Sequence, residues 1–477
     1  MQPLRFFAIL GFLLLPAPLL AANAELSSEL ADQRELAVTI YNNNLALVKD
    51  TRRIKLEHGN NRLAWRDVSA QIRPETALLR NLAHPEGFYL IEQNFDFDLL
   101  TPQKLLDKSV GQEVRVIKTN PATGAETSET ARVLATNSGT VLQFPDRIET
   151  GLPGRLAFKS VPANLRDRPT LAIQFHNPAG ETQNLELSYL TGGLAWKADY
   201  TAELSARDDR LDLNGWVTVT NTSGAAYQNA KLQLVAGDVN RVQDNFGAAY
   251  PRAIAMSAPA PAPKMAEESL FEYHLYTLDR PTTIADQQTK QVALLTASAV
   301  PLTKEFVLRG ADYYYRSGYG ELGQKLKVGV YVEFANQGAK LGIPLPKGIV
   351  RVYKKDSAGN AQFVGEDRID HTPKGEKVRL KLGDAFDLSA DKKQTDFQKL
   401  GGSGRYNTVL ESAYQIELKN AKNEEVRVKV QEPLPGDWEI LSESQPHRKE
   451  TANSASWTMN VPANGKALLT YRARVRY

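Results

Sequence analysis

Residues 189–242 have the sequence YLTGGLAWKADYTAELSARDDRLDLNGWVTVTNTSGAAYQNAKLQLVAGDVNRV, which alternates apolar and polar residues and breaks at Gly, Asn and Asp. Because successive side chains of a strand point to opposite faces, the pattern predicts strands with one apolar face. Residues 206–210 form the turn between two of them. The apolar face holds Trp196, Ala198, Tyr200, Ala202 and Leu204 in one strand, and Leu211, Leu213, Val217 and Val219 in the next. The stretch therefore predicts the centre of a β-sandwich.

Short alternating runs separated by turns continue on both sides of this stretch. A chain of 477 residues is too long for one hydrophobic core, so several domains are expected. We predict an all-β protein made of several immunoglobulin-like β-sandwich units. Runs between residues 101 and 161 are shorter still, which predicts a small inserted β-barrel-like domain. Helical patterns are confined to residues 102–108 and 285–295.

The composition changes after the central stretch, where four prolines lie among alanines in residues 247–268. This composition favours extended, solvated chain over packed structure, so the segment predicts a linker or loop. The expected divisions are a signal peptide (1–24), an N-terminal β domain (25–100), the small insert (101–164), a β-sandwich (165–246), the Pro/Ala-rich segment (247–268) and a C-terminal β-sandwich region (269–477).

A weak internal repeat supports the sandwich prediction. Asn177, Asn221, Asn336 and Asn420 each end an alternating run, and each is followed by a turn and another run. Asn suits such a strand exit because its side chain can bond to the backbone two residues further on. Strand-Asn-turn-strand hairpins of this kind occur in immunoglobulin-like domains. The repeat indicates a fold and carries no information about function.

The N-terminus has the pattern of a secretory signal. Arg5 precedes the apolar run of residues 6–15, and Ala22-Asn23-Ala24 fits the small-x-small rule of signal peptidase. We expect cleavage between Ala24 and Glu25, and an exported protein located in the periplasm, at the cell surface or outside the cell. An uncleaved anchor is the alternative, but the apolar run is well short of the ~20 residues that span a bilayer. No later stretch is apolar enough for a transmembrane helix.

Charge and cysteine content exclude several functional classes. The chain has 58 Lys and Arg against 55 Asp and Glu, so it lacks the basic footprint of a nucleic-acid-binding protein. It has no Cys, which excludes a disulfide, a thiol nucleophile and a Cys-based metal site. Neither a Gly-x-Ser-x-Gly elbow nor a phosphate-binding glycine loop occurs. We therefore expect no cofactor.

Five motifs occur in order along the chain: VTIYNNNLALVKD (38–50), YLTGGLAWKADY (189–200), GWVTVTN (215–221), LVAGDVNRV (234–242) and VRVYKKDSAGNAQFVGEDRIDHTPKGEKVRLKLGDAFD (350–387). Together they resemble those of an exported bacterial family that carries a domain of unknown function. The domain is related to the conserved portion of mucoidy inhibitor A. The resemblance implies an extracytoplasmic all-β protein and brings no catalytic residues with it.

Glu366, Asp367, Asp370 and His371 form the densest cluster of acidic and histidine residues. Carboxylates with a histidine can bind a divalent ion or perform acid-base catalysis. Alternation sets Asp367 apart from Glu366 and Asp370 on the two faces of a strand. Charged residues are ordinary at the exposed end of a strand, and we favour that interpretation. No metal site and no catalytic residues are predicted.

Aromatic residues provide the candidate binding residues. Tyr313, Tyr314 and Tyr315, followed by Tyr319, put aromatic rings on both faces of any strand there, and Trp216 lies on the polar face of its strand. Exposed aromatic rings stack on sugar rings or anchor a protein partner. Burial in a contact between domains is the alternative, because a multidomain chain must cover its internal surfaces.

Three functional hypotheses follow. The first is a non-enzymatic exported protein that binds an envelope protein or polysaccharide through its surfaces. The second is an enzyme acting on envelope polysaccharide with two carboxylates such as Glu366 and Asp370, which requires a defined separation in a shared cleft. The third is an outer-membrane barrel, suggested by the alternation of residues 469–477 up to a terminal aromatic residue. We favour the first and take residues 469–477 as the closing strand of the last sandwich.

Overall fold

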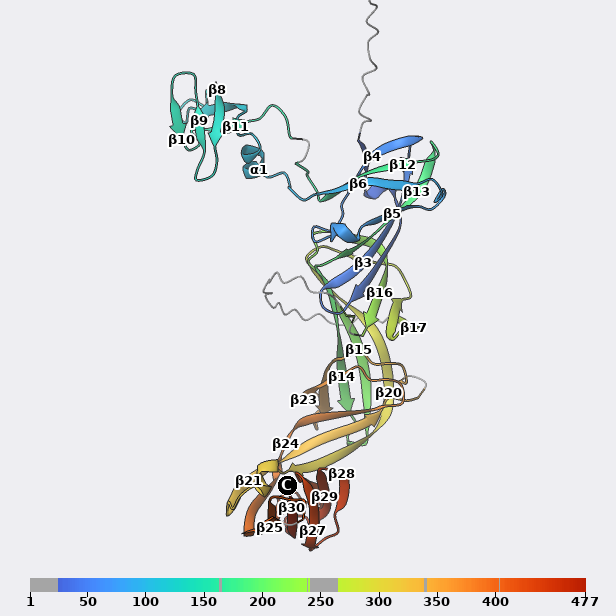
Figure 1. Ribbon diagram of the computed structural model, residues 1–477, viewed down its shortest axis with the longest axis vertical. Helices are drawn as coiled ribbons and strands as arrows, with labels where there is room; N and C mark the ends of the chain where they lie inside the picture. Colours follow the sequence, from blue (N-terminus) through green and yellow to red (C-terminus); the bar gives the residue numbers. More distant parts are fainter. Residues whose placement is uncertain (1–24, 163–164, 238, 241–264, 339–340, 403) are drawn as a thin grey trace, which may run out of the picture. The chain divides into compact units, whose positions relative to one another are not determined.

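The computed structural model describes residues 25–477 except 163–164, 238, 241–264, 339–340 and 403 (Figure 1). Most of the described residues lie in strands and very few in helices, which confirms the all-β prediction, and none of their sheets closes into a barrel. Two compact units are present. The first consists of residues up to 36 together with 48–191, and the second of residues 37–47 with 192–477.

The first unit contains a four-stranded sheet in the order β1-β4-β12-β6. Strand β1 runs parallel to β4, and the other pairs are antiparallel. A second group of strands, β3, β13 and β5, lies in a separate sheet. The bounds are β1 (Leu26–Ser28), β3 (Leu45–Lys55), β4 (Gly59–Arg66), β5 (Leu78–Asn81), β6 (Tyr89–Asp96), β12 (Thr170–Asn177) and β13 (Thr182–Thr191), with short 3-10 turns at η1 (Leu30–Asp32) and η2 (Pro74–Thr76). Apolar side chains of both sheets, including Leu63, Trp65, Phe175 and Leu187, are fully buried.

The expected small insert has a sheet and a core of its own. Its strands have the order β10-β9-β8-β7-β11 and are preceded by helix α1 (Pro102–Asp107). The sheet is open, so the insert does not form the closed barrel that its short runs suggested. Thr101 caps the helix by accepting a hydrogen bond from the Lys104 backbone N–H, and Pro102 suits the first turn. The strands are β7 (Glu113–Thr119), β8 (Glu126–Ala135), β9 (Val141–Gln143), β10 (Ile148–Thr150) and β11 (Arg155–Ala157). The core consists of Leu106, Val114, Val116, Ala131, Val133, Leu142 and Phe144.

In the second unit, the stretch around residues 189–242 forms the expected adjacent strands β14 (Leu194–Leu204) and β15 (Arg210–Asn221). All nine apolar side chains assigned to the inner face are buried. The two strands pair antiparallel along their whole length, and β22 (Gly348–Lys355) lies parallel to β14. Strand β23 (Ala361–Ile369) continues the sheet beyond β22. Alternation therefore fixes this part of the fold.

A further group of strands in the second unit surrounds β16 (Tyr227–Ala236). Residues 37–40 of β2 (Gln33–Tyr41) run parallel to β16. Strands β18 (Tyr273–Leu278) and β17 (Met265–Leu270) extend the group on the other side, and β19 (Thr282–Ile284) pairs with the start of β16. Buried Leu232, Leu234 and Tyr276 form part of its core.

The C-terminal part of the second unit is a sandwich that shares a long strand with the central sheet. Strand β20 (Gln288–Arg309) pairs with β15 along its first part and then with β21 and β26. One sheet of the sandwich has the order β21-β24-β25-β30-β27, and the other is formed by β20, β26, β29 and β28. The two sheets are joined at one edge, where β20 pairs with β21. The bounds are β21 (Glu321–Ala335), β24 (Lys377–Lys399), β25 (Val409–Asn420), β26 (Val426–Pro433), β27 (Asp437–Glu443), β28 (Arg448–Thr451), β29 (Ser454–Val461) and β30 (Lys466–Arg476), with a 3-10 turn η3 (Asp312–Tyr315). Residues 469–477 thus belong mainly to the β30 strand of this sandwich.

The four repeated Asn residues are buried at or just after the ends of strands. Asn221 donates to the carbonyls of Ala225 and Ala285, at 2.8 and 3.0 Å, and its Oδ1 accepts from the Ser223 N–H at 3.0 Å. Asn420 bonds in the same way within its own turn and to the chain beyond β29. The side chains therefore tie each hairpin to a second loop, as well as shaping the turn that the sequence predicted.

Two predictions about local structure had different outcomes. The short helix expected at residues 102–108 is α1, but the helix expected at residues 285–295 is wrong, because β20 begins at Gln288. Its apolar residues pair with β15 instead of forming a helical face. Most of the segment 247–268 lies outside the described residues, and its last residues begin β17.

Candidate functional site

The outward face of strands β14, β15 and β22 carries Trp216 among charged side chains. Trp216 lies directly opposite Asp199 in the antiparallel register, so the two side chains are neighbours on one face. The Asp199 carboxylate accepts hydrogen bonds from Arg351 at 3.1 Å and from the Thr218 hydroxyl at 3.3 Å. Arg351 also pairs with Glu366 at 3.2 Å. We call Trp216, Asp199, Arg351 and Glu366 the Trp216 face.

Trp216 is half-buried, as its even position in β15 predicts. The pairing between β15 and β20 shifts register between Gly215 and Trp216, since Gly215 pairs with Leu295 and Trp216 with Ala293. The extra residue, Leu294, therefore lies in β20, and the alternation of β15 is preserved. Trp216 remains on the opposite side of its strand from buried Val217. The Trp216 indole is therefore packed on one side and keeps part of its ring surface exposed on the polar face.

The four expected tyrosines separate into two pairs. Tyr313 and Tyr319 are 46% and 43% exposed, and their ring centroids lie 5.7 Å apart in an edge-to-face arrangement. Tyr314 and Tyr315 are buried in the core of the C-terminal sandwich. The 3-10 turn η3 explains the division, because it directs consecutive side chains differently from a strand. Tyr313 and Tyr319 are thus available to a ligand, whereas Tyr314 and Tyr315 serve packing.

The acidic cluster around residue 366 is divided among separate partners. Glu366 pairs with Arg351, while Asp367 accepts hydrogen bonds from the Lys381 and Arg368 backbone N–H groups. The His371 ring accepts from the Lys347 N–H at 3.3 Å. Within the described part of the chain, no group of three or more acidic or histidine residues is arranged to hold a metal ion. The expected separation of Asp367 from Glu366 agrees with these different partners.

A small pocket in the second unit brings two other carboxylates near each other. It has a volume of about 220 Å³ and contains Asp208 and Asp384 together with Lys304 and Lys354. Burial raises the pKa of Asp208, but hydrogen bonds from Lys304 and Lys354 outweigh this effect, and the pKa is lowered overall. A general acid of a glycosidase needs a raised pKa, so Asp208 is poorly suited to that role. Neither Glu366 nor Asp370 lines this pocket.

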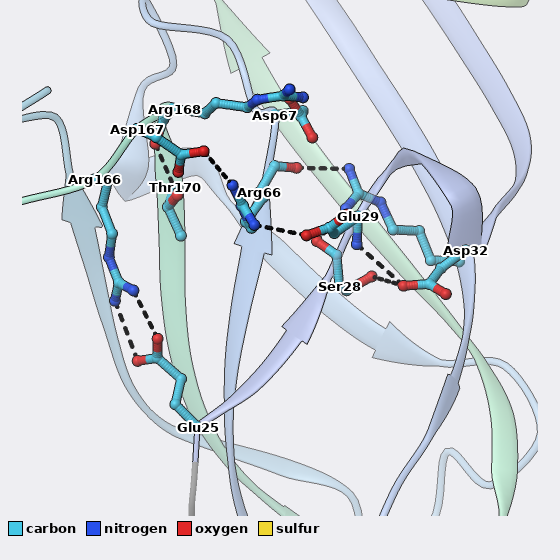
Figure 2. A network of polar contacts seen from close by, with 11 residues as sticks. Glu25, Ser28, Glu29, Asp32, Arg66, Asp67, Arg166, Asp167, Arg168 and Thr170 are labelled. Carbon is cyan, nitrogen blue, oxygen red and sulfur yellow. Dashed lines mark hydrogen bonds and ion pairs between the residues drawn. The ribbon is translucent and has the colours of Figure 1, made fainter. Parts of the chain in front are cut away.

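The first residues of the described chain form a charged network in the first unit (Figure 2). The Arg166 guanidinium donates to both carboxylate oxygens of Glu25, at 2.7 and 3.2 Å. Arg66 bridges Glu29 and Asp167. The hydrogen bond from Arg166 is the main cause of a lowered pKa for Glu25. Ala24, the other residue of the expected cleavage site, lies outside the described residues.

The sequence did not predict which distant residues contact these side chains. Asp199 and Arg351 are 152 positions apart and meet because β14 and β22 run side by side. Alternation places each side chain on the face of its strand opposite the core residues, but no local signal indicates which distant strand is adjacent. Lys392 and Glu432, which are both buried, were missed for the same reason.

The fold and these surfaces define a class: an all-β protein with several sheets that presents aromatic side chains beside charged groups. Residues 185–477 match the family described as Domain of unknown function (DUF4139), and the chain belongs to this family. No curated protein matches the chain. Among the described residues, no helix has the length and apolar character needed to cross a membrane.

Proposed function

We propose that the chain is an exported, non-enzymatic protein of the bacterial cell envelope that binds polysaccharide through the Trp216 face. Export is proposed from the signal pattern that ends at Ala24. The envelope is proposed from the motifs that resemble the family related to mucoidy inhibitor A. The geometry of the Trp216 face is the observation that carries the binding role.

Sugar rings have apolar C–H faces and a rim of hydroxyl groups, so a binding surface needs an aromatic ring beside charged or polar groups. Trp216 supplies the ring, and its partly buried position limits the conformational entropy lost on binding. Arg351 is partly exposed and supplies donors on the same side of the sheet, while Asp199 is buried and pairs with it. Their mutual ion pair holds both groups in place before a ligand arrives.

A protein partner is the competing occupant, since half-buried aromatic residues also anchor protein interfaces. The charged groups around Trp216 favour the polysaccharide, because the centres of protein interfaces are depleted in charged residues. Tyr313 and Tyr319 form a second exposed aromatic pair, and we propose that they add a weaker contact for the same extended ligand.

Affinity electrophoresis with alginate and co-sedimentation with peptidoglycan test the proposal. We expect retention of the wild-type chain by at least one of these, and a loss of about tenfold or more in affinity for Trp216→Ala. Phe386→Ala is the matched control, because Phe386 is 98% exposed and lies outside the Trp216 face, so its removal should leave binding unchanged. The unfolding free energy of Trp216→Ala should fall by less than the ~3–5 kcal/mol of a core aromatic residue.

Two results would contradict the proposal. Equal retention of Trp216→Ala and the wild type would remove the Trp216 face from binding. Absence of retention by both glycans, together with crosslinking of a protein in intact cells that Trp216→Ala abolishes, would replace the polysaccharide by a protein partner.

A further inference from the structure

Two oppositely charged side chains lie in the core of the C-terminal sandwich. Lys392 of β24 and Glu432 of β26 are each 1% exposed, and Lys392 Nζ lies 2.7 Å from Glu432 Oε2. Strand β24 pairs with β21 and β25, whereas β26 pairs with β20 and β29. The amine and the carboxyl group therefore meet from the two opposite sheets of the sandwich.

Tyrosine rings surround the amine. Lys392 Nζ lies 4.3 Å from the ring centroid of Tyr314 and 4.9 Å from that of Tyr414, with Tyr315 and Tyr471 at 6.0 and 5.9 Å. Burial lowers the pKa of Lys392, although Glu432 opposes this effect. A buried lysine with a lowered pKa has more of the neutral, nucleophilic amine than a lysine in water.

The carboxyl group of Glu432 is only partly satisfied. Its Oε2 accepts from Lys392 and from the Tyr315 hydroxyl at 3.1 Å. Within the described residues its Oε1 is fully buried and has no hydrogen-bond partner. A buried carboxylate with an unbonded oxygen is costly, and a proton on the carboxyl group removes part of this cost. A proton passed from the ammonium to the carboxylate would leave a neutral amine in contact with a neutral carboxylic acid.

Two hydroxyl groups connect the amine to the carboxyl oxygen by a second route. The Tyr471 hydroxyl lies 3.3 Å from Lys392 Nζ and 2.7 Å from the Tyr315 hydroxyl. The Tyr315 hydroxyl in turn lies 3.1 Å from Glu432 Oε2. The four groups form a closed ring of hydrogen-bonding contacts. Such a ring can take a proton from nitrogen and deliver it to the oxygen without any water molecule.

We propose that Lys392 and Glu432 become joined by an intramolecular amide bond. Nζ attacks Cδ of the protonated carboxyl group, so the Nζ–Cδ bond forms and the Cδ–Oε2 bond breaks. A proton passes from Nζ through Tyr471 and Tyr315 to Oε2, which leaves as water, while Oε1 remains as the amide oxygen. The step consumes one amine and one acid, yields one amide and one water, and needs no oxidant or cofactor.

The bond would cross-link the two sheets of a chain that has no Cys and therefore no disulfide. It links Lys392 to Glu432, 40 positions further along the chain, and replaces a buried amine and a buried carboxyl group by one amide. The inference is independent of the proposed polysaccharide binding, because none of these four residues belongs to the Trp216 face.

Peptide mapping of the folded wild-type chain by mass spectrometry tests the cross-link directly. We expect a branched peptide that contains both Lys392 and Glu432, with a mass one water molecule below the sum of the two linear peptides. Recovery of both residues only in linear peptides, after the folded chain has been kept at neutral pH for several days, would overturn the proposal. This measurement needs no variant and does not depend on where the signal is cleaved.

Two conservative variants separate chemistry from packing. Tyr471→Phe keeps the ring but removes the hydroxyl that links Nζ to Tyr315, so we expect the branched peptide to decrease at least several-fold. Tyr414→Phe is the matched control, because the Tyr414 ring also faces Lys392 but its hydroxyl donates to the Tyr314 carbonyl. Circular dichroism checks that both variants fold. Equal yields of the branched peptide in the two variants would overturn the assigned proton route.

Discussion

Among the described residues, each unit contains an ion pair with both side chains almost fully buried, and the two pairs are satisfied to different degrees. In the first unit, Arg52 is fully buried and its guanidinium donates to Asp50 at 2.9 Å and to the Ser28 and Arg66 carbonyls, both at 2.8 Å. Asp50 also accepts from Gln33 and from the Trp65 indole N–H, at 2.8 and 3.0 Å. In the second unit, the Lys392–Glu432 pair leaves Glu432 Oε1 without a hydrogen bond from any described residue.

The difference follows from the chemistry of the two cations. A guanidinium stays charged and offers a planar fork of donors, so it can bind a carboxylate and two carbonyls together. An ammonium has three donors and loses its proton more readily when buried. The Asp50–Arg52 pair is therefore a fixed structural centre. The Lys392–Glu432 pair has the proximity and the unsatisfied oxygen that favour reaction.

Asp50→Ala should have the largest effect on stability. The substitution leaves the buried Arg52 without its counter-charge and removes the acceptor of Gln33 and Trp65. Breaking a buried pair in this way costs about 3–5 kcal/mol, which urea unfolding will measure. Glu126→Ala is the control, because it breaks an exposed pair with Arg155 and should cost less than about 1 kcal/mol. Similar losses in the two variants would contradict the structural role of Asp50.

A second substitution distinguishes the two pairs. Lys392→Met leaves the buried Glu432 carboxyl group with only the Tyr315 hydroxyl as donor. Adding Glu432→Leu removes this carboxyl group, so the double variant should be about 1–3 kcal/mol more stable than Lys392→Met alone. Neither variant can form the proposed amide, so the comparison is unaffected by it. Adding Arg52→Met to Asp50→Leu should bring no such recovery, because the Ser28 and Arg66 carbonyls lose their donor. If urea unfolding shows that the second substitution restores stability in both pairs, the proposed difference between the two ion pairs is wrong.

Local patterns predicted the strands of this protein well and their distant neighbours poorly. Alternation placed the inner face around Tyr200 and the outward position of Trp216, since both depend only on parity within a strand. It failed at residues 285–295, where a short apolar run fits a helix and a buried strand equally. The chemistry of Asn221 was predicted only in part. Its bond to Ser223 is local, whereas its bond to Ala285 depends on a loop 64 residues away.

The candidate sites show the same limit. The Asp199–Arg351 and Lys392–Glu432 pairs join strands that are not consecutive in the sequence, and the register that sets Lys392 against Glu432 depends on both sheets of the sandwich. Residue type did not mark either side chain, because Lys and Glu usually lie at the surface. Burial of Tyr314 and Tyr315 was missed because a 3-10 turn, and not a strand, carries them.

Breaking the partly exposed pair of Glu25 and Arg166 should change the free energy of unfolding least, so this pair is a comparison for the two buried pairs. The hydrogen bond from Arg166 lowers the pKa of folded Glu25 below its ordinary 4.5. The stabilisation is therefore fully present above the unfolded pKa and is lost as the pH falls through the lower folded value. Glu25→Ala should cost no more than about 1 kcal/mol at pH 7, and less in high salt. The difference from the wild type should disappear in acid, since protonated Glu25 no longer pairs with Arg166.

Urea unfolding at several pH values measures this dependence, and a difference that persists unchanged in strong acid would show that Glu25 stabilises the first unit by packing and not by charge.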